Sequence, residues 1–278
     1  KNKTTMTDPR FLTKTIVITG AGGNFGQDGC LFFAKAGARV AALDKDPRSL
    51  AETTKKVQAD FPTTEILALE CDVTSPKSVA DAIGKVVERF GSIDMVWNNA
   101  GYQGKIIPTL EYDPADFALV MNINVTGMFV VLQACAQHMA KQVTGGSIVN
   151  TSSVAGLRGT PAMVAYASSK AAVLAMTVST SKDLAPHKIR VNAVSPALIG
   201  PGYMWQRQNE LHASSGSPYF ATDPDVVARD KINSVPMKRL GSVKEVINSV
   251  AFLLSDDASY TTGINLVVDG GMSAGLKA

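Results

Sequence analysis

The stretch TIVITGAGGNFG, residues 15–26, joins a short apolar run to a glycine-rich turn. The run TIVIT consists entirely of β-branched residues, which favours a β-strand. Three glycines then fall within four residues, so the backbone can turn tightly and approach a bound group closely. A strand, a glycine-rich turn and a helix together form a site where the positive end of the helix meets a pyrophosphate. We therefore expect the first βα unit of a dinucleotide-binding sheet here.

The rest of the chain repeats this alternation of apolar runs and helical patterns. Several of the runs are continuously apolar, as strands are when helices cover both faces of a parallel sheet. Strands are expected at 15–20, 38–44, 65–72, 93–101, 146–153, 189–196 and 263–271, and helices at 26–36, 47–59, 76–90, 114–140, 162–185 and 243–254. The pattern predicts an α/β fold, a Rossmann-type doubly wound sheet of seven parallel strands with helices on both faces.

The organisation expected is a single domain. Residues 1–13 are polar and are interpreted as an N-terminal extension, and residues 14–278 as one Rossmann-fold unit without an internal linker. Residues 197–236 interrupt the rhythm between the sixth strand and the last helix. A long insertion beside the carboxyl ends of parallel strands predicts a substrate-covering lid.

Composition and charge exclude several classes of protein. The 278 residues are 45% hydrophobic and 18% charged, and 27 basic side chains nearly balance 24 acidic ones. With no basic run and no apolar run approaching 18 residues, we expect neither nucleic acid nor a membrane as a partner. Three scattered cysteines and three isolated histidines predict buried thiols, no metal site and a cytoplasmic location.

Polar residues and glycines end four successive expected strands, where open α/β sheets bind their ligands. Asp44 ends the second strand, and a carboxylate there favours NAD over NADP because it binds ribose hydroxyls and repels a 2′-phosphate. Asp72 ends the third strand, and Asn98-Asn99-Ala100-Gly101 ends the fourth.

Tyr166 and Lys170 lie four residues apart and therefore on one face of the expected helix. A nearby ammonium stabilises a phenolate, so Lys170 is expected to lower the pKa of Tyr166 toward neutral pH. Such a phenol takes the proton from an alcohol as hydride leaves its carbon. Ser153 ends the fifth strand, where its hydroxyl would hold the substrate oxygen.

These elements occur in the order typical of one family. From about Thr15 to Gly271 the sequence resembles the short-chain dehydrogenases/reductases, through the glycine loop, Asp72, the NNAG segment, Ser153 and the Tyr166/Lys170 pair. The resemblance implies a catalytic set of Asn124, Ser153, Tyr166 and Lys170, in which Asn124 supports a proton relay. It also implies an NAD site formed by Gly20, Gly23, Asn24, Phe25, Gly26, Asp44, Asp72, Val73, Asn99, Ala100, Gly101, Tyr166, Lys170, Pro196 and Ile199.

The sequence departs from the family pattern in three places. Asn24 replaces the second loop glycine, Ala197 replaces the glycine after Pro196, and Pro201 stands where a threonine usually holds the carboxamide. The anchoring of the nicotinamide is therefore expected to depend more on the backbone of Ile199.

Within the family the AGGN loop, NNAGYQG and GPGYMWQRQNELHA are most similar to bacterial xylitol and other polyol dehydrogenases. This similarity implies reversible, NAD-linked oxidation of a secondary alcohol in a sugar alcohol to a ketose. Candidate substrate contacts are Gln103, Ser153, Met163, Tyr166, Tyr203 and Trp205, which combine hydrogen-bonding groups with an apolar floor.

Two alternatives remain open. The same fold and residues reduce 3-oxoacyl thioesters, although Asp44 and a glycine loop without basic residues oppose the NADPH preference of that activity. A non-catalytic dinucleotide-binding protein is a further alternative, which the complete catalytic set opposes. Family analogy and the apolar helices 114–140 and 162–185 predict a homotetramer.

Overall fold

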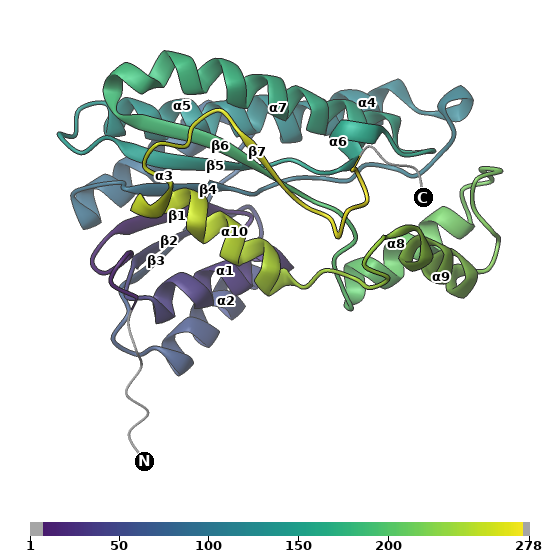
Figure 1. Cartoon of the computed structure of the whole chain (residues 1–278). Helices are drawn as coiled ribbons and strands as arrows, with labels where there is room; N and C mark the ends of the chain where they lie inside the picture. Colours follow the sequence, from purple (N-terminus) through teal and green to yellow (C-terminus); the bar gives the residue numbers. More distant parts are fainter. Residues whose placement is uncertain (1–7, 275–278) are drawn as a thin grey trace.

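Seven parallel strands form the sheet in the order β3-β2-β1-β4-β5-β6-β7 of the computed structural model, which describes residues 8–274 (Figure 1). The strands are β1 (Thr15–Thr19), β2 (Arg39–Asp44), β3 (Ile66–Glu70), β4 (Met95–Asn98), β5 (Gly146–Thr151), β6 (Ile189–Pro196) and β7 (Asn265–Val268). The order reverses between β1 and β4, so the crevice of a doubly wound sheet is expected above these two strands. The predicted fold is confirmed, although β4 and β7 are shorter than expected.

The helices cover both faces of the sheet (Figure 1). They are α1 (Asn24–Lys35), α2 (Pro47–Asp60), α3 (Pro76–Phe90), α4 (Pro114–Met121), α5 (Met128–Met139), α6 (Ala155–Arg158), α7 (Val164–Leu184), α8 (Tyr203–Ala213), α9 (Pro224–Ser234) and α10 (Val243–Leu254). Helices α1, α2 and α10 lie on one face, and α3, α4, α5 and α7 on the other. Alternate side chains of β1 serve the two layers: Ile16 and Ile18 pack toward α1 and α10, and Val17 toward α3 and α5.

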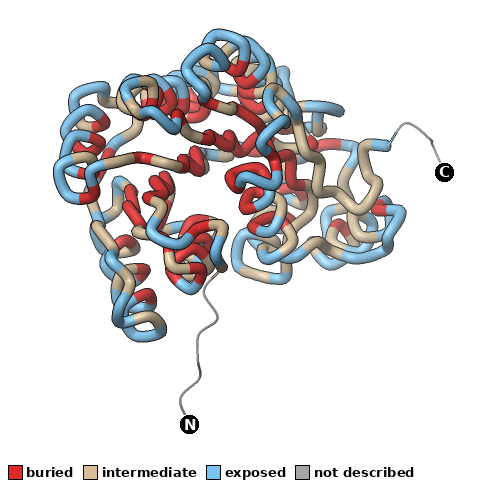
Figure 2. The backbone as a smooth tube through the Cα atoms, turned by 60° about the vertical axis from the view of Figure 1, so that its left-hand side comes forward, coloured by how far each residue is buried: buried red, intermediate tan, exposed pale blue. Residues whose placement is uncertain are grey.

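Buried residues follow the strands and the inner sides of the helices, and exposed residues follow their outer sides (Figure 2). The helix starts are encoded locally. Asp46 caps α2 by accepting a hydrogen bond from the Arg48 amide, and Ser242 forms a capping box with Glu245 at α10. Helices α8 and α9 fill the segment 197–236 and stand apart from the two layers, beside the carboxyl ends of the strands (Figure 1).

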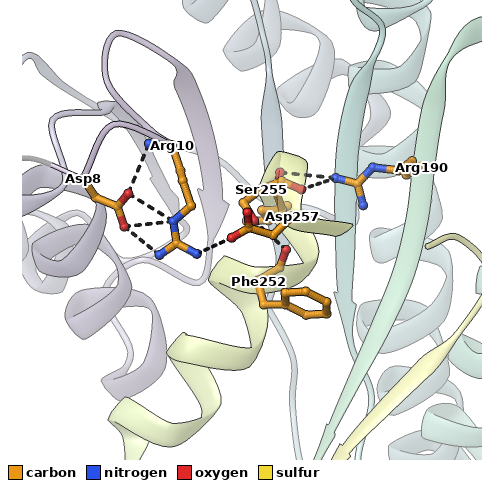
Figure 3. A network of polar contacts seen from close by, with 7 residues as sticks. Asp8, Arg10, Arg190, Phe252, Ser255 and Asp257 are labelled. Carbon is orange, nitrogen blue, oxygen red and sulfur yellow. Dashed lines mark hydrogen bonds and ion pairs between the residues drawn. The ribbon is translucent and has the colours of Figure 1, made fainter. Parts of the chain in front are cut away.

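Ion pairs and caps fasten the start of the chain and the end of α10 (Figure 3). Arg10 contacts Asp8 and, at 2.9 Å, Asp257 just beyond α10. Arg190 of β6 donates to the Ser255 carbonyl at 2.9 Å and to the Leu253 carbonyl at 2.7 Å. These bonds satisfy carbonyls that a helix end leaves without partners. The described part of the extension expected at 1–13 therefore contributes to the fold.

The helical run Pro114–Met139 is, by length and composition alone, long and apolar enough to cross a membrane. This differs from the expectation that no apolar run approaches 18 residues. In the fold the run is partly buried, and α5 packs against α3, β4 and β5 as a core helix.

Phe11 offers a test of how much the extension stabilises the domain. Its side chain is fully buried and meets Phe33 edge to face at 5.2 Å between ring centres, whereas its neighbour Leu12 is 50% exposed. We expect Phe11→Ala to lower the free energy of unfolding by about 3–5 kcal/mol, the usual cost of emptying a phenylalanine site. Leu12→Ala is the matched control and should change it by less than about 1 kcal/mol. Equal effects in urea unfolding would contradict this packing role.

Candidate active site

The Thr19 hydroxyl connects the two turns that flank the switch point of the sheet. Its Oγ1 accepts hydrogen bonds from the Asn99 amide at 2.9 Å and the Ala100 amide at 3.0 Å. Gly20 follows with a positive φ of 66°, and a Cβ added there would lie 3.0 Å from the Ala100 Cα. Only glycine allows the turns after β1 and β4 to approach this closely.

The glycine-rich turn leaves the start of α1 open. The N-cap residue, Gly23, provides no side-chain hydrogen bond, and the first turn of α1 contains no acidic residue. A Cβ added at Gly26 would lie 2.1 Å from the Gly20 carbonyl oxygen, so the helix begins in direct contact with the turn. Exposed backbone amides and the helix dipole suit this position to a pyrophosphate.

The Asp44 side chain fixes the glycine-rich turn to the end of β2. Its carboxylate accepts a hydrogen bond from the Gly22 amide at 2.8 Å and another from the Asp46 amide at 3.0 Å. A negative charge is thereby fixed at the carboxyl end of β2. In dinucleotide-binding sheets, an acidic residue at this position accepts hydrogen bonds from a ribose diol and repels a phosphate.

Tyr166 and Lys170 lie one turn apart on α7, as their spacing predicts. The Lys170 ammonium is buried, lies 5.5 Å from the centre of the Tyr166 ring and donates to the Thr151 carbonyl at 2.8 Å. The Ser153 hydroxyl accepts from the Ala155 amide at 3.1 Å and forms a hydrogen bond with Tyr166. The ends of β5 and α7 thus bring a phenol, a hydroxyl and an ammonium together.

Burial changes the electrostatics expected for this pair. It raises the pKa of Tyr166, and the hydrogen bond from Ser153 opposes that shift only in part. Burial also lowers the pKa of Lys170 to about 8, so the ammonium loses its charge more readily than a solvated lysine. The expected lowering of the Tyr166 pKa is therefore not met in the protein alone, because burial raises that pKa and the Ser153 hydrogen bond opposes the rise only in part.

Asn124 lies in a π-helical segment, Asn122–Gly127, that separates α4 from α5 where the sequence predicts one continuous helix. Its side chain accepts from the Tyr102 amide at 2.7 Å, and donates to the Tyr102 carbonyl at 2.8 Å and to the Ser169 hydroxyl at 3.0 Å. Segments of this kind are frequent at functional sites. The π segment thus fastens the loop after β4 to α7.

Two cavities meet at these groups. We call the first the crevice; it measures about 450 Å³ and lies along the glycine-rich turn, Asp44 and the ends of β4 and β5. We call the second the side cavity; it measures about 440 Å³ and lies between α7 and the helices α8 and α9. Both are lined by Ser153, Tyr166, Ala197 and Gln208. A group bound in either cavity therefore reaches the same phenol and hydroxyl.

Most of the residues predicted to bind a dinucleotide line the crevice. They are Gly20, Gly23, Asn24, Phe25, Asp44, Asn99, Ala100, Gly101, Tyr166, Lys170, Pro196 and Ile199. Gly26 lies behind the turn instead. Asp72 accepts hydrogen bonds from Thr74 in an exposed turn, and Val73 lies beside Gly127; neither lines the crevice.

The residues predicted to contact substrate are divided between the cavities. Met163 lines the side cavity, whereas Gln103 and Trp205 line the crevice. Tyr203 is 67% exposed and lines neither.

Sequence reasoning did not single out Thr19, Gln208, His212 or Lys231. Gln208 and His212 lie one turn apart on α8, but Lys231 joins them only because α9 packs against α8, for which the sequence carries no spacing signal. Thr19 was detectable, since a polar residue ends the first strand immediately before the glycines.

Comparison with known proteins agrees with this geometry. A profile of the family described as "Enoyl-(Acyl carrier protein) reductase" matches residues 24–273. A crystal structure of an NAD⁺-bound xylitol dehydrogenase is 48% identical, covers 94% of this chain and 100% of its own, and superimposes with a TM-score of 0.92. The chain belongs to the short-chain dehydrogenases/reductases.

Other relatives within this family differ in the activities for which they are named. Levodione reductase of Leifsonia aquatica is 34% identical, over 95% of this chain and 96% of its own. A 3-oxoacyl-(acyl-carrier-protein) reductase of Thermotoga maritima is also 34% identical, over 95% of this chain and 99% of its own. This short-chain dehydrogenase/reductase is thus an oxidoreductase, and its relatives do not agree on one substrate.

Thr19 and Thr15 allow a matched test of how the crevice is built. Both are fully buried on β1, but the Thr19 hydroxyl serves two amides, whereas the Thr15 hydroxyl has no hydrogen-bond partner among residues 8–274. Thr19→Val should lower the free energy of unfolding by about 2 kcal/mol or more, because it leaves buried amides unpaired. Thr15→Val should be neutral or stabilising. Urea unfolding of both variants decides, and a larger loss for Thr15→Val would refute this account of the crevice.

Proposed function

We propose that this protein oxidises a secondary alcohol in a sugar alcohol to a ketone, reversibly, with NAD as its cofactor. The observation that carries the proposal is that Ser153 and Tyr166 line both cavities, with Lys170 directly behind them. A dinucleotide in the crevice and an alcohol in the side cavity both reach these side chains, which carry the hydroxyl groups shared by the two cavities. The similarity to an NAD⁺-bound xylitol dehydrogenase supports both the cofactor and the substrate class.

When bound, NAD accepts the hydride from the carbinol carbon. The side chains of this protein then act on the proton and the oxygen. The Ser153 hydroxyl donates to the substrate oxygen and orients it, and the Tyr166 phenolate takes the proton of the alcohol. In the reverse direction the neutral phenol returns that proton, and the raised pKa of Tyr166 keeps more of it in this form.

Lys170 and Asn124 support the phenol in this proposal. Lys170 faces the Tyr166 ring and, while charged, stabilises the phenolate that oxidation requires. Asn124 accepts a hydrogen bond from the Tyr102 backbone amide. Gly101, which precedes Tyr102 in the chain, lines the crevice together with Lys170. By fastening this loop beside Lys170, Asn124 would support a proton relay from the lysine toward solvent.

Three further proposals follow from the arrangement of the molecule. Segment 197–236 acts as a lid, since its helices α8 and α9 form one wall of the side cavity. Four copies assemble through α4, α5 and α7, which expose Leu119, Phe129 and Val178. The three buried, unpaired cysteines suit a cytoplasmic location.

Tyr166→Phe tests the reaction. With NAD and a panel of pentitols and hexitols, we expect NADH formation by the wild type and a loss of about 10²–10⁴-fold in kcat for the variant, because the proton acceptor is removed. Tyr260→Phe, on a fully exposed side chain, is the control and should keep full activity. Absorbance at 340 nm is the measurement. Oxidation of NADPH by a 3-oxoacyl thioester, with no activity on any polyol, would replace this proposal by the reductase alternative.

Asp44→Asn tests the choice of cofactor. The asparagine side-chain oxygen still accepts a hydrogen bond from the Gly22 backbone amide. The side chain no longer carries the negative charge that repels a 2′-phosphate. We expect the ratio of kcat/KM for NADP to that for NAD to rise about tenfold or more, the scale of one hydrogen bond to a charged group. Asp46→Asn makes the same charge change at the cap of α2 and should leave the ratio unchanged. An unchanged ratio in Asp44→Asn would show that this carboxylate does not select the cofactor.

A further inference from the structure

Lys231 of α9 is a largely buried ammonium in the wall of the side cavity. It donates to the Asn209 side-chain oxygen at 2.7 Å and lies 5.4 Å from the centre of the Trp205 ring. No carboxylate of the described chain lies within ion-pair distance of it. A charge removed from water without a counter-charge costs several kcal/mol, which a negatively charged ligand would offset.

The neighbouring His212 does not share this charge. Burial and the Lys231 ammonium lower the pKa of His212 to about 4, so its imidazole is neutral near pH 7. The ring Nδ1 lies 2.7 Å from the Gln208 carbonyl oxygen, which only accepts, so Nδ1 carries the hydrogen. Nδ1 therefore offers no lone pair to Lys231, 3.0 Å away, and part of the donor capacity of the ammonium remains unused.

The other charges on this cavity also favour an anion. Arg158 lies at its rim, and its guanidinium contacts only the Met272 backbone carbonyl among residues 8–274. The one acidic residue in the lining, Asp230, is exposed. Two cations thus share the cavity with a single, solvated carboxylate.

We infer that the side cavity binds the negatively charged end of the substrate, a carboxylate on a polyhydroxy chain, and that the Lys231 ammonium holds it. Ser153 and Tyr166 line the same cavity, so the carbinol group reaches them from the other end of that chain. The inference rests on the proposed alcohol oxidation and narrows its substrates from neutral polyols to polyhydroxy acids.

The test compares a pentitol with the pentonate of the same configuration, using NAD and absorbance at 340 nm. In the wild type we expect kcat/KM for the pentonate to exceed that for the pentitol about tenfold to hundredfold, the contribution of a hydrogen bond between charged groups. Lys231→Met should abolish this advantage, because it raises KM for the pentonate much more than KM for the pentitol. Lys182→Met changes the net charge equally on an exposed part of α7 and should retain the advantage.

A purely structural role of Lys231, holding α9 on α8, predicts a different result. Both substrates would then lose activity equally in Lys231→Met, or the wild type would not prefer the pentonate; either result overturns the inference. Lys231→Gln keeps a donor for Asn209 and provides a second variant if the methionine variant does not fold.

A binding measurement separates this inference from the proposed function. We expect the pentonate, with NADH present, to raise the Tm of the wild type but not that of Lys231→Met, because only the wild type pairs the carboxylate. If neither compound is oxidised, the proposed function fails. The carboxylate site at Lys231 is then still supported if the wild type alone shows the rise in Tm, and it fails if no rise is seen.

Discussion

The hydroxyl of Thr19 is the contact on which the architecture of the site depends. Strands β1 and β4 are neighbours in the sheet but about eighty residues apart in the chain, and the crossovers that follow them leave in opposite directions. The Thr19 hydroxyl oxygen accepts hydrogen bonds from both backbone amides of the turn after β4. It thereby sets the distance between this turn and the turn after β1. This distance positions the groups that line the crevice: the glycines, the open start of α1 and the Asn99–Gly101 segment.

The fold could be predicted because its signals are local. β-Branched runs, glycines at turns and prolines at helix starts are signals that span only a few residues. Pro47 and Pro76, for example, begin α2 and α3. The catalytic set was also accessible, since Tyr166 and Lys170 share one helix and Ser153 ends a strand. The structure brings these three together with Asn124.

The substrate side was not predictable to the same depth, for a physical reason. The neighbours of Lys231 come from α8, 22 and 19 residues earlier in the chain. Their approach depends on how two short helices pack together rather than on any period in the sequence. The aromatic and polar residues at the start of α8 look like contacts, yet a helix turns Tyr203 toward solvent and Trp205 toward the crevice. The π segment escaped prediction as well, because its residues are no different from those of an α-helix.

Lys170, which is buried, and Lys231, which is partly buried, both lower the stability of the fold below the pH range in which lysines ordinarily titrate. Burial lowers the pKa of both Lys170 and Lys231 to about 8, well below the value of a solvated lysine. The unfolded chain therefore holds more protons than the folded chain between about pH 8 and the ordinary lysine range. Stability contributed at these sites consequently rises with pH across that interval and is reduced below it. The folded protein therefore has a lower free energy of unfolding at neutral pH because each of these lysines lines a cavity instead of lying in water.

The π segment between α4 and α5 also determines how the protein would respond to the deletion of one residue. A π turn holds about one residue more than an α-helical turn, so removing one residue there would restore a regular helix and leave α4 and α5 in nearly their present orientation. Only residues of the segment itself would point in new directions, so Asn124 would lose its hydrogen bonds to Tyr102. Deletions are ordinarily accepted in loops and rejected in helices through lost packing. Here a single deletion would instead preserve the helix and misdirect the side chain that holds the loop after β4.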